Sequence, residues 1–153
     1  MGCDPTSENP ASAVVRAVER VLDLAATWPA WDGVPRLADD GERHYTPNKA
    51  MRRMADHLVD HLAEVESVLA GVPTEPDRWH ASTVTLDADL APFTPTDLDE
   101  AVQRLRRLAR MFELRYAAAG PAAWDAPRDG WTLREIAKHV ADPWYAEQVG
   151  DLS

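Results

Sequence analysis

The sequence has little of what marks secreted, membrane-bound or nucleic-acid-binding proteins. Cys3 is the only cysteine among 153 residues, so no disulfide can form within the chain, and a cytoplasmic protein is the simplest interpretation. No apolar run approaches the roughly 20 residues of a membrane-spanning helix, and no secretory signal follows Met1. Lys and Arg number 16 against 26 Asp and Glu, which gives a net charge of −10. We therefore expect a soluble chain that binds neither nucleic acid nor an anionic membrane.

The chain has the length of one folded domain. At this size a protein buries roughly 70% of its extended surface and needs no disulfide or metal to fold. Residues 1–10 are small, polar and proline-containing, and we expect a flexible N-terminus there. We expect residues 11–153 to form a single domain.

Apolar side chains recur at helical spacing in four long stretches. These cover residues 12–27, 47–70, 94–116 and 132–144. Pro143 removes a backbone donor and is expected to kink the last helix. The pattern predicts an all-α fold, an up-and-down four-helix bundle with long loops.

Start and stop signals define three of these helices. Thr46 can cap the second helix, which Gly71 can end in a left-handed conformation. Thr96 and Asp99 stand in a near capping-box relation at the third helix. Thr132 and Glu135 form the strongest capping box, at the last helix.

Two connections are unusually long for a compact domain. Residues 27–45 hold several prolines, glycines and tryptophans, and we expect a loop packed by its own aromatic side chains. Residues 71–95 include a β-branched run at 82–86, which is a strand or simply extended chain. Loops of this length are often functional.

A basic strip lies along the third predicted helix, formed by Arg104, Arg106, Arg107 and Arg110. One interpretation is a surface that holds an anionic substrate. The other is a solvated helix face whose arginines pair with Glu100 and Glu113.

Three of the five histidines lie on apolar helix faces. His57 and His61 are four residues apart, which places their Cβ atoms about 6 Å apart on one face, and His139 lies on the apolar face of the last helix. His44 and His80 lie in loops. Three imidazoles with one open position are typical of catalytic zinc, which acidifies a bound water or thiol. The alternative is three hydrogen-bonded packing residues.

The surroundings of these histidines are also part of the hypothesis. We expect the imidazoles to point to the core, while the neighbouring charges point to water: Arg52, Arg53, Asp56 and Asp60. Asp60 and Glu64 are either solvated or orient the imidazoles, and Trp144 is either core or the wall of a pocket. The segment His-Leu-Val-Asp-His lacks the glutamate of the zinc-protease motif, so that class is not supported.

Two segments resemble a known family. WTLREIAKHVAD (residues 131–142) is similar to the Trp-Ser/Thr-x-Arg-Glu-x-x-x-His-x-x-Asp segment of the DinB/YfiT-like superfamily, which includes the N-terminal domain of mycothiol-dependent maleylpyruvate isomerase. RRMADHLVDH (residues 52–61) resembles the His-x-x-x-His helix of the same superfamily. The two segments occur in permuted order, since the His-x-x-x-His helix here comes first.

The resemblance implies a four-helix bundle in which His57, His61 and His139 bind a divalent metal, commonly zinc or nickel. It also implies transfer or isomerisation chemistry with a low-molecular-weight thiol cosubstrate such as mycothiol or bacillithiol. We therefore expect a metal-dependent thiol S-transferase, or a hydrolase, that acts on a small-molecule substrate. The alternative is a non-catalytic helical bundle, either a monomer or a homodimer, that binds a small ligand or metal.

Overall fold

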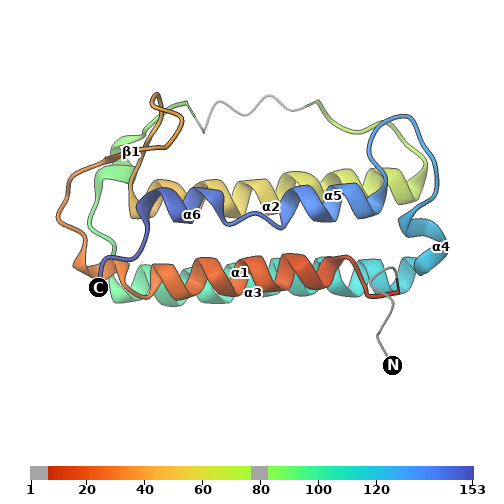
Figure 1. Ribbon diagram of the computed structural model, residues 1–153, viewed down its shortest axis with the longest axis horizontal. Coiled ribbons are helices and arrows are strands. Elements are labelled where there is room, and N and C mark those ends of the chain that lie inside the picture. The colour runs from red at the N-terminus through yellow and green to blue at the C-terminus, as the bar shows by residue number, and fades with distance from the viewer. Residues whose placement is uncertain (1–6, 77–82) are drawn as a thin grey trace.

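The protein is mostly helical, which confirms the all-α prediction (Figure 1). The computed structural model describes residues 7–76 and 83–153. Its main helices are α1 (Ala11–Ala25), α2 (Pro47–Ala70), α3 (Pro95–Ala119), α5 (Leu133–Val140) and α6 (Trp144–Val149). The shorter elements are the 3-10 turns η1 (Trp28–Ala30) and η2 (Asp87–Leu90), the helix α4 (Pro121–Trp124), and the strands β1 (Arg36–Leu37) and β2 (His44–Tyr45), which pair antiparallel.

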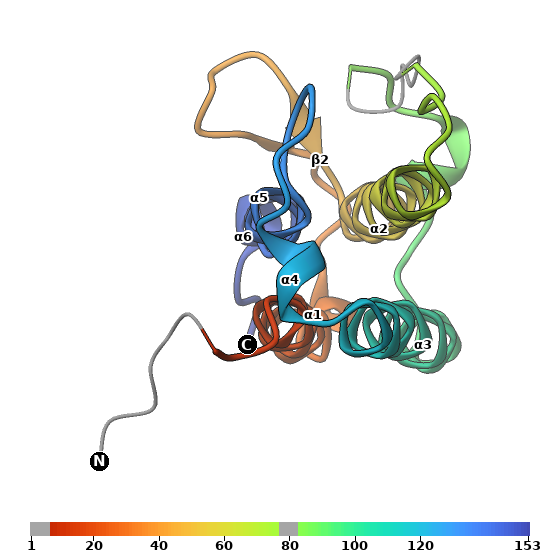
Figure 2. The ribbon, with the colours of Figure 1, turned by 90° about the vertical axis from the view of Figure 1, so that its right-hand side faces the viewer.

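The main helices lie side by side around a common core. Viewed end-on, α1, α2, α3 and the consecutive α5 and α6 occupy the corners of a square (Figure 2). Contacts follow the sides of this square: α1 packs on α3, α3 on α2, α2 on α5 and α6, and these two on α1. Fully buried side chains between the helices include Val14, Leu58, Leu105, Phe112 and Ile136. Within the described residues, no helix combines the length and apolar character that crossing a bilayer requires.

The helices do not alternate strictly in direction. Along Figure 1, α2 runs from left to right, and α3 also runs from left to right. The expectation of an up-and-down order is therefore wrong for this pair. The physical reason is the connection between residues 71 and 94, which is long enough to return along the 24-residue α2 before α3 begins.

The capping residues of α2 act as the sequence predicts. The Thr46 hydroxyl accepts a hydrogen bond from the Lys49 amide at 3.1 Å, and Gly71 ends the helix with φ +69°. The N-cap of α3 was expected near Thr96, but it is Thr94, whose side chain accepts from the Asp97 amide. Pro95 explains the shift, because proline is favoured at the first helical position.

The last predicted helix is broken rather than kinked. Its capping box is confirmed: the Thr132 amide donates to Glu135 at 2.7 Å, and the Glu135 amide donates to the Thr132 hydroxyl at 3.2 Å. Helix α5 ends at Val140, and α6 begins only at Trp144. Pro143 lacks an amide hydrogen and disfavours helical geometry in the residue before it, so the helix stops there and restarts.

The two long connections pack on distant parts of the chain. Trp28 is fully buried, donates its Nε1 hydrogen to the Gly150 carbonyl at 2.9 Å and lies edge-on to Phe93. The first connection is thus held by the C-terminal segment and Phe93, and not by its own aromatics alone. In the second connection, residues 83–86 form no strand, and Ser82 lies outside the described residues.

At the N-terminus, residues 1–6, including Cys3, lie outside the described part of the chain. The Asn9 side chain donates to the Glu113 carbonyl at 3.0 Å, so the end of this segment contacts α3.

The basic strip of α3 is a solvated face. Arg110 pairs with Glu113 at 2.5 Å, as the second interpretation predicts. Arg106 pairs with Glu19 of α1 at 2.8 Å instead of with Glu100, and these side chains are about half exposed. The Arg106–Glu19 pair therefore joins α3 to α1.

Candidate metal centre

Three histidines from two adjacent helices converge at one place. His57 and His61 lie on α2, and His139 lies on α5. Each offers one ring nitrogen such that the three nitrogens lie within 4.8 Å of one another. The Nε2 atoms of His57 and His139 are 3.0 Å apart. Sequence reasoning thus identified three residues that the structure brings together; their binding of a metal stays a prediction.

One pair of ring nitrogens in the donor set lies close to the spacing that a tetrahedral ion requires. Zinc lies 2.0–2.1 Å from imidazole nitrogens, which places two such nitrogens about 3.4 Å apart. The 3.0 Å separation of His57 and His139 is within a few tenths of this value. Three neutral imidazoles suit zinc and nickel, so the residues present fit the group that the sequence resemblance implies.

Glu64 orients one of these imidazoles. Its Oε2 atom lies 2.8 Å from Nδ1 of His61. A proton held on Nδ1 by this carboxylate leaves Nε2 of the same ring as a lone-pair donor. Asp60 is 3.9 Å from Nε2 of His61, which is too long for a hydrogen bond. Of the two acidic residues singled out from the sequence, Glu64 is the one in direct contact.

The histidines border a cavity and do not point into a closed core. His57 and His61 are half-buried and His139 is exposed, which contradicts the expectation that all three face the core. The cavity has a volume of about 420 Å³ and opens between α2 and the α5–α6 segment. It is lined by the three histidines together with Arg43, Arg53, Asp56, Asp60, Trp131, Asp142, Trp144 and Tyr145.

Some charged residues of α2 line the cavity instead of facing bulk water. Arg53 is only 6% exposed, and Asp56 and Asp60 also border the cavity. The expectation of an outward position is wrong for these three. Arg53 is four positions before His57 and Asp60 is three positions after it, so both share the helix face of that histidine. Arg52 turns away and binds Asp89 of η2 at 2.6 Å. The four-residue step from Arg53 to His57 was the signal that could have placed this arginine.

Aromatic rings form the walls around the imidazoles. The Trp131 ring lies 4.7 Å from that of His139, and the Tyr145 ring lies 5.7 Å from that of His57. Trp144 lines the cavity and also packs against the core, so it has features of both interpretations offered for it. Sequence reasoning did not assign Trp131 or Tyr145 to the site.

The electrostatic environment favours the neutral form of the His139 imidazole. Burial lowers the pKa of His139 below its usual value, and the neighbouring His61 lowers it further. A neutral imidazole has the lone pair that a metal requires.

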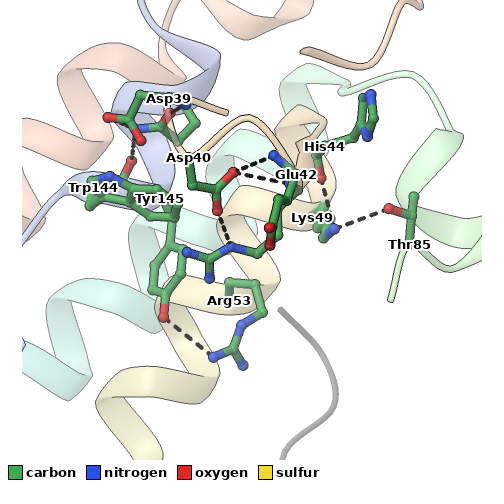
Figure 3. Close-up of polar contacts among 11 residues, drawn as sticks. Asp39, Asp40, Glu42, His44, Lys49, Arg53, Thr85, Trp144 and Tyr145 are labelled. Atoms are coloured by element: carbon green, nitrogen blue, oxygen red, sulfur yellow. Dashed lines mark hydrogen bonds and ion pairs between the residues drawn. The ribbon is translucent and has the colours of Figure 1, made fainter. Parts of the chain in front are cut away.

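The remaining histidines do not contribute to this cluster. His44 is exposed on β2, and its carbonyl accepts a hydrogen bond from the Lys49 ammonium at 2.7 Å (Figure 3). His80 lies outside the described residues.

These features describe a three-nitrogen site beside a small, partly aromatic cavity. Comparison with known proteins adds no assignment: no protein-family model matches the chain, and neither a curated protein nor a solved structure matches it.

Proposed function

We propose that this protein is a divalent-metal-dependent enzyme in which His57, His61 and His139 hold zinc or nickel. The observation that carries the proposal is the convergence of the three ring nitrogens within 4.8 Å at the edge of a cavity. Three protein ligands leave one position for a water or a substrate, which is typical of catalytic rather than structural sites.

We further propose that the chain is a DinB/YfiT-like four-helix bundle with its two motif helices in permuted order. The square arrangement of the helices supports this proposal (Figure 2). Helices α2 and α5, which carry the two motifs, are in contact, so their inward side chains meet whichever helix comes first in the chain.

The proposed reaction is transfer or activation of a low-molecular-weight thiol, with metal-dependent hydrolysis as the nearest variant. A divalent ion at the three histidines supplies Lewis-acid chemistry that lowers the pKa of a thiol or water bound to it. Glu64 fixes the tautomer of His61, and the walls formed by Trp131, Trp144 and Tyr145 restrict the cavity to small molecules. A cavity of about 420 Å³ is within the range of small-molecule sites.

A second candidate function is a non-catalytic homodimeric bundle that binds a small ligand. Exposed apolar side chains on α2 and α3 favour it: Val59 is 47% exposed, Met111 51% and Leu114 53%. Size-exclusion chromatography with light scattering distinguishes a monomer from a dimer.

Metal analysis of protein purified without a histidine tag tests the first proposal. After incubation with zinc or nickel and dialysis, we expect about one ion per chain by plasma mass spectrometry. His139→Ala should lose the ion, whereas His44→Ala, which removes an exposed histidine outside the cluster, should retain it. Wild-type protein without bound metal, or equal metal content in both variants, would refute the metal-dependent function.

A further inference from the structure

A second cavity lies at the end of the bundle where α2 ends and α4 lies (Figure 1). Its volume is about 420 Å³, which is within the range of small-molecule sites. The C-terminal end of α2 and Val72 form one side, and residues 123–128 form the other together with Leu133. Within the described part of the chain, no residue lines both this cavity and the one beside the histidines. The two cavities are therefore separate.

The lining of this second cavity is apolar except for one side chain. Val68 and Leu69 are half-buried, Leu133 is 2% exposed and Val72 is 54% exposed. Among the described residues that line the cavity, Arg128 alone is charged. The histidine cavity, in contrast, is lined by three aspartates and two arginines. The second cavity therefore suits a ligand that is mostly apolar and carries one group that an arginine binds.

The loop before α5 positions the Arg128 guanidinium. Nη1 of Arg128 donates to the Trp131 carbonyl at 2.6 Å. A Cβ atom at Gly130 would lie 3.3 Å from this nitrogen, and Gly130 has φ +101°, so glycine lets the guanidinium lie close to the loop. Asp125 of the same loop pairs with Arg134 at 2.8 Å. Across residues 7–76 and 83–153, no carboxylate pairs with Arg128, so its charge lacks a counter-ion there.

We propose that this cavity binds a small apolar carboxylic acid, with the carboxylate on Arg128 and the apolar part between α2 and Leu133. A planar guanidinium matches the geometry of a carboxylate, and the hydrogen bonds between them are charge-assisted. The Trp131 carbonyl takes one of the five guanidinium N–H groups and leaves others for a ligand. An alkyl chain or aromatic ring on the ligand would remove the apolar lining from water.

Isothermal titration of the metal-free, full-length protein tests the inference. The probes are octanoate and octanamide, which share an alkyl chain and differ in charge. We expect saturable binding of octanoate, and weaker binding of octanamide. Arg128→Gln should weaken octanoate binding by about tenfold or more and leave octanamide binding unchanged, because hydrogen bonds to charged groups carry that discrimination.

Three further variants serve as controls and as a second test. Arg104→Gln removes a positive charge from an exposed position on α3, and should leave the affinity for octanoate unchanged. Val72→Asp keeps Arg128 and places a carboxylate at the cavity, so it should weaken octanoate binding by about tenfold or more. Val59→Asp adds the same charge to α2 outside the cavity, at a position 47% exposed, and should have no effect. The two aspartate variants decide the question if Arg128→Gln does not fold.

Three outcomes would overturn the inference. The first is a wild-type protein without saturable octanoate binding, or equal losses for acid and amide in Arg128→Gln. The second is equal losses in Val72→Asp and Val59→Asp, which would show binding to apolar surface in general. The third is a wild-type dimer that Val72→Asp dissociates in light scattering, since a second copy would then cover the cavity. The metal centre is tested separately, because these titrations use metal-free protein and change no histidine.

Discussion

Tyr116 provides a quantitative test of how α5 is held in place. The side chain is fully buried on α3, and its hydroxyl donates to the Leu133 carbonyl in the first turn of α5 at 2.6 Å. Tyr116→Phe retains the ring and removes the hydroxyl together with its hydrogen bonding to the backbone of α5. Leu133 is the first residue of α5, where its carbonyl can accept an amide from the next turn, so we expect a loss of about 1–1.5 kcal/mol in the free energy of unfolding. For a chain of 153 residues this corresponds to a melting temperature lower by about 3–5 °C.

The pH dependence of the same variant gives an independent check. Burial raises the pKa of Tyr116 above its ordinary value. The folded state therefore binds the phenolic proton more tightly than the unfolded state, whose tyrosine has a pKa of about 10. This contribution is fully present below pH 10 and is lost as the pH rises towards the folded-state pKa.

Urea denaturation of metal-free wild-type and Tyr116→Phe protein at pH 7.5 and pH 10.5 measures both effects. We expect the wild type to be more stable at pH 7.5, by a margin that shrinks at pH 10.5. Equal stabilities at pH 7.5, or a margin that does not change with pH, would show that the hydroxyl does not hold α5 as described.

Two further predictions concern the metal site and the second long connection. Glu64→Gln should weaken zinc binding by about tenfold or more in a competition titration with a chelator, because it removes the charge that orients His61, while leaving the melting temperature of the metal-free protein nearly unchanged. An unchanged zinc affinity would contradict that role. Asp89→Ala should lower the free energy of unfolding by about 2–4 kcal/mol in urea, because it leaves the half-buried Arg52 without its carboxylate and removes the acceptor of the Leu86 amide. A loss below about 0.5 kcal/mol would show that this pair behaves as an ordinary surface ion pair.

Helix positions and helix ends could be predicted where their causes are local. Thr46, Gly71 and the Thr132–Glu135 pair act within one turn of their own helix, so the sequence pattern was sufficient. The direction of α3 relative to α2 was not predictable in this way. It depends on how the end of the second connection is held, and residues 83–94 are held by contacts between distant residues such as Trp28 with Phe93 and Arg52 with Asp89.

The part of the candidate site that depends on helical spacing alone could be predicted from the sequence. His57 and His61 could be paired from their four-residue step, and His139 from the apolar face of its helix. The burial of Arg53 was missed because charged side chains are rarely buried. Trp131 and Tyr145 were missed because their positions depend on where α5 begins and on where α6 starts again.

The break between α5 and α6 determines in which directions His139 and Tyr145 point around the helix axis. An α-helix turns about 100° per residue, so in one continuous helix the six residues from His139 to Tyr145 would leave these side chains about 120° apart around the axis. In the structure both line the same cavity on α2. The three residues between the helices, 141–143, change the rotation of α6 relative to α5 so that both side chains face the cavity. A substitution of Pro143 that let the helix continue would rotate Tyr145 away from the cavity without changing any residue that lines it.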